Sequence, residues 1–166
     1  DLRIPADLEW AYAASSRKNQ PKYANGNEYL RDSKGKYEMN YMCYSKEQCR
    51  YDSIKKLYVP KKEIVDLKSK EENPGFVADG AFHTSTVKGY NPNSYGLYGM
   101  AGNASEMINT FNKKAMKYSR TGTKGGSWFS CDYFLEIDAD DEYPDEVEAS
   151  PLIGFRPVFT APKVSK

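Results

Sequence analysis

The sequence predicts an α+β fold with short, mainly antiparallel strands, one or two helices and much irregular loop. Twelve glycines and nine prolines are spread along the chain, which indicates frequent turns in place of long periodic helices. The 14 tyrosines suit such a fold, because a tyrosine buries its ring and keeps its hydroxyl near water. At 166 residues the chain is expected to form a single domain with a buried core.

The first predicted element is a short helix within Arg3–Ser15, which reads RIPADLEWAYAAS. Pro5 suits a helix start, and Asp7 and Glu9 fall in the first turn, where carboxylates interact favourably with the helix dipole. A helix of this length persists only when it packs on the rest of the domain. One of its faces carries Leu8, Ala11 and Tyr12, with Trp10, Ala13 and Ala14 alongside.

Loops and brief strands are predicted after this helix, since residues 22–42 contain the turn signals Asn25-Gly26 and Lys34-Gly35. The lysine- and glutamate-rich region at about residues 43–76 is interpreted as a charged insertion. Its apolar stretch Leu57–Pro60 predicts either a partner-docking arm or a surface excursion without a partner.

The acidic run Asp138–Glu148 predicts a solvated loop, with an electrostatic contact to a basic partner as the alternative.

Three glycine-containing blocks follow one another, and together they are the most specific pattern in the chain. They read GLYGMAGNASEM from Gly96 to Met107, KGGSWFS from Lys124 to Ser130, and GFRPV from Gly154 to Val158. With the helix at residues 3–15, they resemble the formylglycine-generating enzyme (sulfatase-modifying factor) family. This resemblance implies a variant of the C-type-lectin fold, of which residues 1–166 are expected to form the later part. Asn103, Trp128 and Arg156 are then expected to be structural residues.

A closer resemblance indicates a function. Residues 22–42, Tyr133–Glu136 and Ile153–Arg156 resemble segments of the gliding-motility and type IX secretion lipoproteins of the GldK/PorK and GldJ types. This implies a non-catalytic scaffold or interaction domain on the periplasmic face of the outer membrane, assembling with other cell-envelope proteins. The alternatives are a formylglycine-generating-type oxidase acting on protein cysteine, and a C-type-lectin-like, diversified variable protein that binds a ligand.

The three cysteines decide between a catalytic and a non-catalytic relative. The family's oxidases hold copper with two cysteines five residues apart, and the matching positions here are Ser130 and Leu135. No copper is therefore expected. Cys131 is the weak catalytic candidate, although a small buried residue on a strand is the favoured interpretation. Cys43 and Cys49 are close enough in sequence to form a disulfide in an oxidising compartment.

The resemblance also implies two calcium sites, because hard cations prefer several oxygen ligands. For the first site the matching residues are Asn40 and Asp79 by their side chains, with Tyr41 and Ala81 by their carbonyls. The second site is expected to be weakened, because Gly99 replaces a side-chain ligand. Its remaining ligands would be Gly102, Ala104 and Glu106.

The net charge and the hydropathy of the sequence argue against nucleic acid and a membrane-spanning segment as means of association. The net charge of +1, from 24 basic and 23 acidic residues, gives no overall field directed at nucleic acid. The sequence has no apolar stretch of 18 residues. Contact with a membrane is therefore expected only through an anchor outside these residues.

Overall fold

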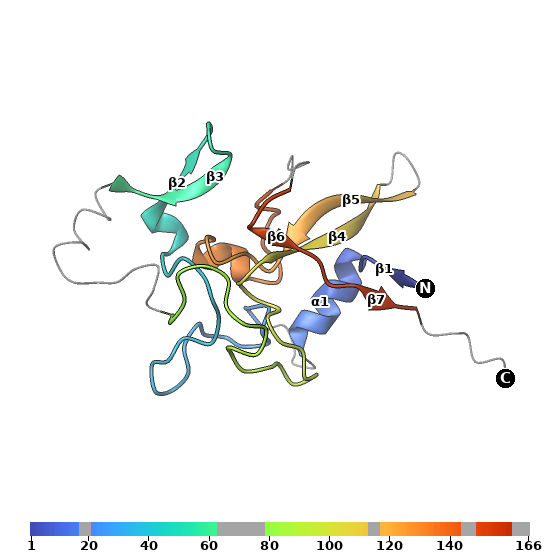
Figure 1. The fold of residues 1–166 in the computed structure, drawn as a ribbon, viewed down its shortest axis with the longest axis horizontal. Helices are drawn as coiled ribbons and strands as arrows, with labels where there is room; N and C mark the ends of the chain where they lie inside the picture. Colours follow the sequence, from blue (N-terminus) through green and yellow to red (C-terminus); the bar gives the residue numbers. More distant parts are fainter. Residues whose placement is uncertain (17–20, 63–78, 113–116, 144–148, 161–166) are drawn as a thin grey trace.

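A computed structural model describes residues 1–16, 21–62, 79–112, 117–143 and 149–160. It confirms the α+β prediction: the described residues contain one α-helix, short strands and long irregular loops (Figure 1). Within these ranges no helix is long and apolar enough to cross a membrane.

The central sheet has the strand order β5-β4-β6. Strands β4 (Ser105–Asn112) and β5 (Lys117–Lys124) pair antiparallel, with a register shift between Ile108 and Asn109. Strand β6 (Ile153–Gly154) pairs parallel to the start of β4. A second small sheet joins β1 (Leu2–Arg3) to β7 (Val158–Phe159) and so brings the two ends of the described chain together (Figure 1).

Helix α1 (Asp7–Ser15) begins close to the predicted start. The Glu9 carboxylate accepts a hydrogen bond from the Ala6 backbone N–H at 2.8 Å, which satisfies one free donor at the helix N-terminus. Burial selects Trp10 and Ala14, whereas Leu8 and Tyr12 on the other face are exposed. The helix therefore packs through the face that carries Trp10 and Ala14. The spacing of apolar residues in the sequence did not identify this face as the buried one.

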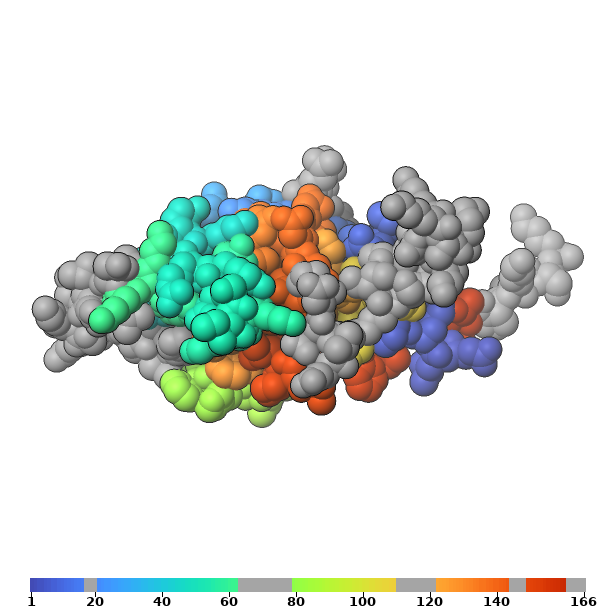
Figure 2. All heavy atoms as spheres, turned by 90° about the horizontal axis from the view of Figure 1, so that it is seen from above, coloured from blue at the N-terminus to red at the C-terminus, as the bar shows by residue number. Residues whose placement is uncertain are grey.

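The first part of the predicted insertion is an ordered hairpin. A single 3-10 turn, η1 (Lys46–Gln48), leads into β2 (Cys49–Asp52), which pairs antiparallel with β3 (Leu57–Pro60). The Tyr58 ring lies 5.1 Å, centroid to centroid, from the ring of Phe134 on the 3-10 helix η3 (Asp132–Leu135). Figure 2 shows the hairpin lying against the segment that contains η3. The insertion is thus anchored to the domain as far as residue 62, and residues 63–76 lie outside the described ranges.

Two glycines allow the glycine-rich blocks to meet. Gly102 has a φ of +70°, and a Cβ there would lie 2.0 Å from the Asn40 carbonyl oxygen. Gly125 has a φ of +89°, and its Cβ would lie 2.6 Å from the Met100 carbonyl oxygen. The Gly102 N–H donates to the Gly125 carbonyl at 2.7 Å. Only residues without a side chain permit this close backbone approach.

A buried polar contact fixes the helix, the central sheet and the C-terminal segment relative to one another. The Trp10 indole Nε1–H donates to Glu106 Oε2 at 2.8 Å. The Arg156 guanidinium donates to both oxygens of the same carboxylate at 2.6–3.0 Å. Its Nη2 also donates to the Tyr98 carbonyl at 2.7 Å, in the glycine-rich turn. The Glu106 side chain is 9% exposed and that of Arg156 is 29% exposed, so the carboxylate end of this ion pair is shielded from water.

Glu106→Ala should lower the free energy of unfolding by about 3 kcal/mol or more, because it leaves the Arg156 guanidinium without its charge partner. Urea denaturation of the purified chain measures the loss. The control is Lys22→Ala, which removes a more exposed ion pair with Glu136 and should cost under about 1 kcal/mol. Equal losses in the two variants would contradict this role of Glu106.

Candidate functional site

The residues predicted for the first calcium site lie together where the loops after residues 39 and 79 meet. The Asp79 carboxylate accepts hydrogen bonds from the backbone N–H groups of Tyr41 at 2.8 Å and Ala81 at 3.0 Å. Burial raises the pKa of Asp79, although these hydrogen bonds oppose the shift. The Asn40 amide nitrogen donates to the His83 carbonyl at 2.7 Å.

One atom at this site has an unsatisfied hydrogen-bonding capacity. Asn40 is 1% exposed, and its Oδ1 has no hydrogen-bond partner among the described residues. An orphaned buried oxygen next in sequence to Tyr41, whose N–H binds the Asp79 carboxylate, fits the oxygen donors that calcium prefers. Asn40 and Asp79, with the carbonyls of Tyr41 and Ala81, would hold the ion. Calcium binding here stays a prediction.

The residues predicted for the second calcium site are engaged in other contacts. Both Glu106 oxygens accept hydrogen bonds from Arg156, and Oε2 also accepts from Trp10. The Gly102 carbonyl accepts a hydrogen bond from the Ala104 N–H at 3.0 Å. The Asp79 oxygens also accept hydrogen bonds, so the first site is favoured only by the unsatisfied Asn40 Oδ1. In the described part of the chain, no group of three or more histidine, cysteine, aspartate or glutamate residues is placed to hold a metal.

The predicted structural residues connect the glycine-rich blocks. Asn103 has a φ of +72°, and its Oδ1 accepts from the Ser85 N–H at 2.7 Å and from the Asn40 amide at 3.2 Å. The backbone N–H of Trp128 donates to the Asn103 carbonyl at 3.1 Å. The Trp128 ring packs edge-on against the His83 ring, at 4.7 Å between centroids. His83 is therefore a packing residue in this structure.

The two positions that match the oxidases' copper cysteines are both in the interior. Ser130 and Leu135 are fully buried. The Ser130 hydroxyl donates to the Glu142 carboxylate and lies 3.1 Å from the Ser127 hydroxyl. The Ser127 hydroxyl lies 3.2 Å from the Tyr143 hydroxyl. Hydrogen bonding among polar side chains thus occupies the place where the family's oxidases bind copper.

The acidic run is only partly a solvated loop. Glu142 and Tyr143 are each 6% exposed, and Asp141 Oδ1 accepts from both the N–H and the hydroxyl of Thr123 on β5. The expectation of a solvated run is therefore wrong for Asp141–Tyr143, whose side chains complete a buried polar cluster. Residues 144–148 lie outside the described ranges. Burial raises the pKa of Glu142 to about 7, and its hydrogen bonds from Ser130 and Tyr143 oppose that shift.

The cysteines do not group as their spacing in the sequence predicts. Cys131 is fully buried, and it packs with Cys49 in an apolar cluster that also contains Met42, Tyr44 and Phe134. Cys43 packs against the other core cluster, around Trp10 and Leu135. All three are free thiols in this structure. The contact between Cys49 and Cys131 joins residues far apart in sequence, which the spacing of cysteines could not reveal.

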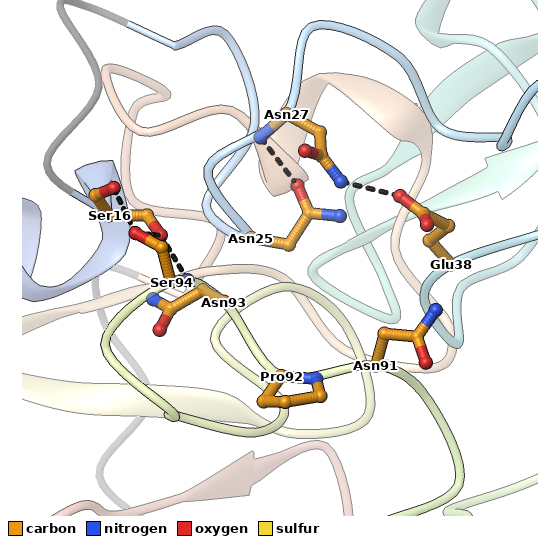
Figure 3. Close-up of a pocket in the computed structure, with 8 residues that line it drawn as sticks. All are labelled: Ser16, Asn25, Asn27, Glu38, Asn91, Pro92, Asn93 and Ser94. Atoms are coloured by element: carbon orange, nitrogen blue, oxygen red, sulfur yellow. Dashed lines mark hydrogen bonds between the residues drawn. The ribbon is translucent and has the colours of Figure 1, made fainter.

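A polar cavity of about 340 Å³ lies between the end of α1 and the loop before the first glycine-rich block (Figure 3). Its walls are held by the Ser16 hydroxyl, which accepts from the Ser94 N–H at 2.5 Å, and by the Asn27 amide, which donates to Glu38 Oε2 at 2.5 Å. The lining consists mainly of amides and hydroxyls: Ser16, Asn25, Asn27, Glu38, Asn91, Pro92, Asn93 and Ser94. None of these residues stood out in the sequence as a site.

Residues 2–161 match the sulfatase-modifying factor enzyme 1-like domain. The chain belongs to this family. Treponema denticola variable protein 1 and the protein CarF are similar solved structures, each with 22% sequence identity and a TM-score of 0.47. Each alignment covers 94% of this chain and 46% of the other, so the chain spans about half the length of these structures. No curated protein sequence gives a significant match.

Membership of the sulfatase-modifying factor family is consistent with the predicted fold. The first calcium site stays a prediction, and the structure adds that Asp79 binds the N–H of Tyr41, the residue after Asn40. The sequence did not reveal the burial of Glu142 or the packing of Cys49 with Cys131. The sequence did contain a signal for the burial of Glu142, because the next residue, Tyr143, is an aromatic residue inside the acidic run. No local signal marked the packing of Cys49 with Cys131, because the two residues are about 80 positions apart in the sequence.

Glu142 should make the domain less stable as pH rises. Its pKa is about 7 when folded and near 4.5 when unfolded, so between these values the folded state holds a proton that the unfolded state has lost. The free energy of unfolding should therefore fall by roughly 3 kcal/mol from pH 4.5 to pH 7. Urea denaturation across this range measures the fall. In Glu142→Gln this contribution should vanish, and identical pH profiles for both proteins would contradict the prediction.

Proposed function

We propose that this domain is a non-catalytic interaction module of a bacterial cell-envelope assembly, of the kind formed by gliding-motility and type IX secretion lipoproteins. The observation that carries the proposal is the replacement of the copper-binding cysteine pair by Ser130 and Leu135, both buried. Without two thiolates at these positions the domain lacks the copper site by which its catalytic relatives activate oxygen. Its partners would be other envelope proteins at the periplasmic face of the outer membrane.

The β2–β3 hairpin is the surface we assign to partner contact. Its inner side is anchored through Tyr58 to η3, whereas Tyr51 and Ile54 are 53% and 93% exposed. Lys55 and Lys56 add positive charge at the exposed turn, and Arg50 is exposed near the other end of the hairpin, opposite Val59. An apolar side chain projecting between cationic residues fits a partner surface with an apolar pocket and an acidic rim.

A photo-cross-linking amino acid at Ile54, in the full-length protein in its native cells, tests this assignment. We expect adducts with one or a few envelope proteins, identified by mass spectrometry. The matched control is the same substitution at Leu8, which is 83% exposed on α1 and far from the hairpin in sequence. Absence of adducts at Ile54, or the same adducts from both positions, would overturn the docking role of the hairpin.

A second candidate function is ligand binding, and the polar cavity of Figure 3 favours it. Asn25 Nδ2, Glu38 Oε1 and the Asn91 amide make no hydrogen bonds with other described residues, and all three residues line this cavity. Amides and a carboxylate offer both donors and acceptors, which matches the paired hydroxyls of a neutral sugar. The cavity volume of about 340 Å³ is at the lower end of the range for small-molecule sites.

Saturation-transfer NMR with glucose, galactose, mannose and N-acetylglucosamine, each at millimolar concentration, tests sugar binding. We expect transfer to at least one sugar and about tenfold weaker binding in Asn91→Ala, because that change removes hydrogen bonds without altering the core. Glu47→Gln on η1, away from the cavity lining, should bind as the parent does. Absence of transfer to every sugar, or equal affinity in Asn91→Ala, would reject this second candidate.

A further inference from the structure

The strongest unassigned chemistry in the molecule is the thiol pair behind the hairpin. Cys49 is the first residue of β2 and is 6% exposed, and Cys131 immediately precedes η3 and is fully buried. Backbone hydrogen bonds hold the two segments in place: the Met42 N–H donates to the Ser130 carbonyl, and the Asp132 N–H donates to the Tyr44 carbonyl, both at 3.0 Å. The Asp132 carboxylate also accepts from the Lys46 N–H at 2.9 Å.

These anchors flank Cys131 and precede Cys49 along the chain, and the Tyr58–Phe134 ring contact, which follows Cys49, closes the same cluster. The sulfur atoms are therefore brought together by backbone and packing contacts that do not depend on the thiols. A disulfide requires its two cysteines to be close before they react, and this arrangement supplies that proximity.

The two thiols have different environments. The interaction between the two sulfur groups lowers the pKa of Cys49, and the same interaction together with burial raises the pKa of Cys131. Burial and the charges of Asp132 and Glu142 disfavour the Cys49 thiolate, whereas Lys61 favours it. Cys49 is also the more exposed of the pair, which makes it the first nucleophile in an exchange reaction.

We propose that Cys49 and Cys131 are the site of an intramolecular disulfide, formed by exchange with a disulfide of the oxidised-glutathione or thiol-oxidoreductase class. The Cys49 thiolate attacks one sulfur of the oxidant, which releases one thiol and leaves a mixed disulfide on Cys49. Cys131 then loses its proton and attacks Cys49 Sγ, which releases the second thiol. The protein loses two protons and two electrons, and the oxidant is reduced to two thiols.

Cys43 is not the partner of Cys49 in this proposal. Its backbone has a φ of +59°, and its thiol donates to the Tyr41 carbonyl at 3.4 Å, in contact with the other core cluster. Burial raises the pKa of Cys43 to about 12, so it is a poor nucleophile at neutral pH. The short spacing between Cys43 and Cys49 is therefore outweighed by the packing of the folded chain.

The bridge would attach the hairpin covalently to the domain. Among the described strands, β2 and β3 pair only with each other, so side-chain packing and the adjoining loops hold the hairpin in the thiol form. A disulfide would close a loop of about 80 residues, which strongly restricts the unfolded chain. The oxidised domain should therefore melt on the order of 10 °C higher than the reduced one. This inference is independent of the proposed function.

The test uses the full chain equilibrated in a glutathione redox buffer, blocked with an alkylating reagent and digested with trypsin without reduction. Cleavage after Lys46 separates Cys43 from Cys49. We expect the Cys49 peptide to be linked to the peptide that begins at Gly125 and contains Cys131, with Cys43 alkylated. Thermal melting of the same samples, with and without dithiothreitol, measures the stability shift.

Variants separate the pairings. Cys43→Ser should keep both the linked peptide and the melting shift, whereas Cys131→Ser should lose both. If Cys131→Ser fails to fold, the peptide map of the unaltered protein still decides the question. A Cys43–Cys49 link, or three alkylated cysteines after equilibration in oxidised glutathione, would overturn the proposal.

Discussion

The Glu106 carboxylate is the point through which the parts of this domain are fixed relative to one another. It lies near the start of β4 and binds Trp10 of α1 and Arg156 of the C-terminal segment. Arg156 in turn binds the carbonyl of Tyr98. A shielded charge must keep its partner, because the cost of leaving it unpaired exceeds what the pair itself contributes. The Glu106–Arg156 pair thus fixes the relative positions of α1, β4 and the C-terminal segment more than it adds to the free energy of unfolding. The glycine-rich turn is held by the same arginine, which binds the Tyr98 carbonyl.

This arrangement explains how the domain retains its family's fold without the copper-binding pair. The contacts of Glu106 and the close approach of Gly102 to Asn40 involve neither Ser130 nor Leu135. Those two positions have instead joined the interior, one in a hydrogen-bonded cluster and the other in the apolar core. A fold that is supported elsewhere can therefore vary at these two positions, and fold alone does not determine function.

The sequence predicted what depends on local chemistry or on several motifs taken together. Helix α1 followed from its first-turn carboxylates, and the α+β fold followed from the glycine-rich blocks and the family resemblance. Burial of Glu142 could not be predicted in this way, because an acidic run is solvated unless distant hydroxyls and amides satisfy it. Here Ser130 supplies such a hydroxyl. The same limit applies to the helix face, where tertiary packing selects Trp10 and leaves Leu8 in solvent.

The one-residue offset of Cys131 from the family's cysteine position has a large structural consequence. The backbone at Cys131 is extended, with a φ of −76° and a ψ of 168°, and successive side chains of an extended chain point in different directions. Ser130 contacts Glu142, whereas Cys131 packs with Cys49 behind the hairpin. A thiol at position 131 therefore does not occupy the surroundings of one at position 130. The offset therefore moves thiol chemistry away from the family's copper position and places it where it can control how firmly the hairpin is held.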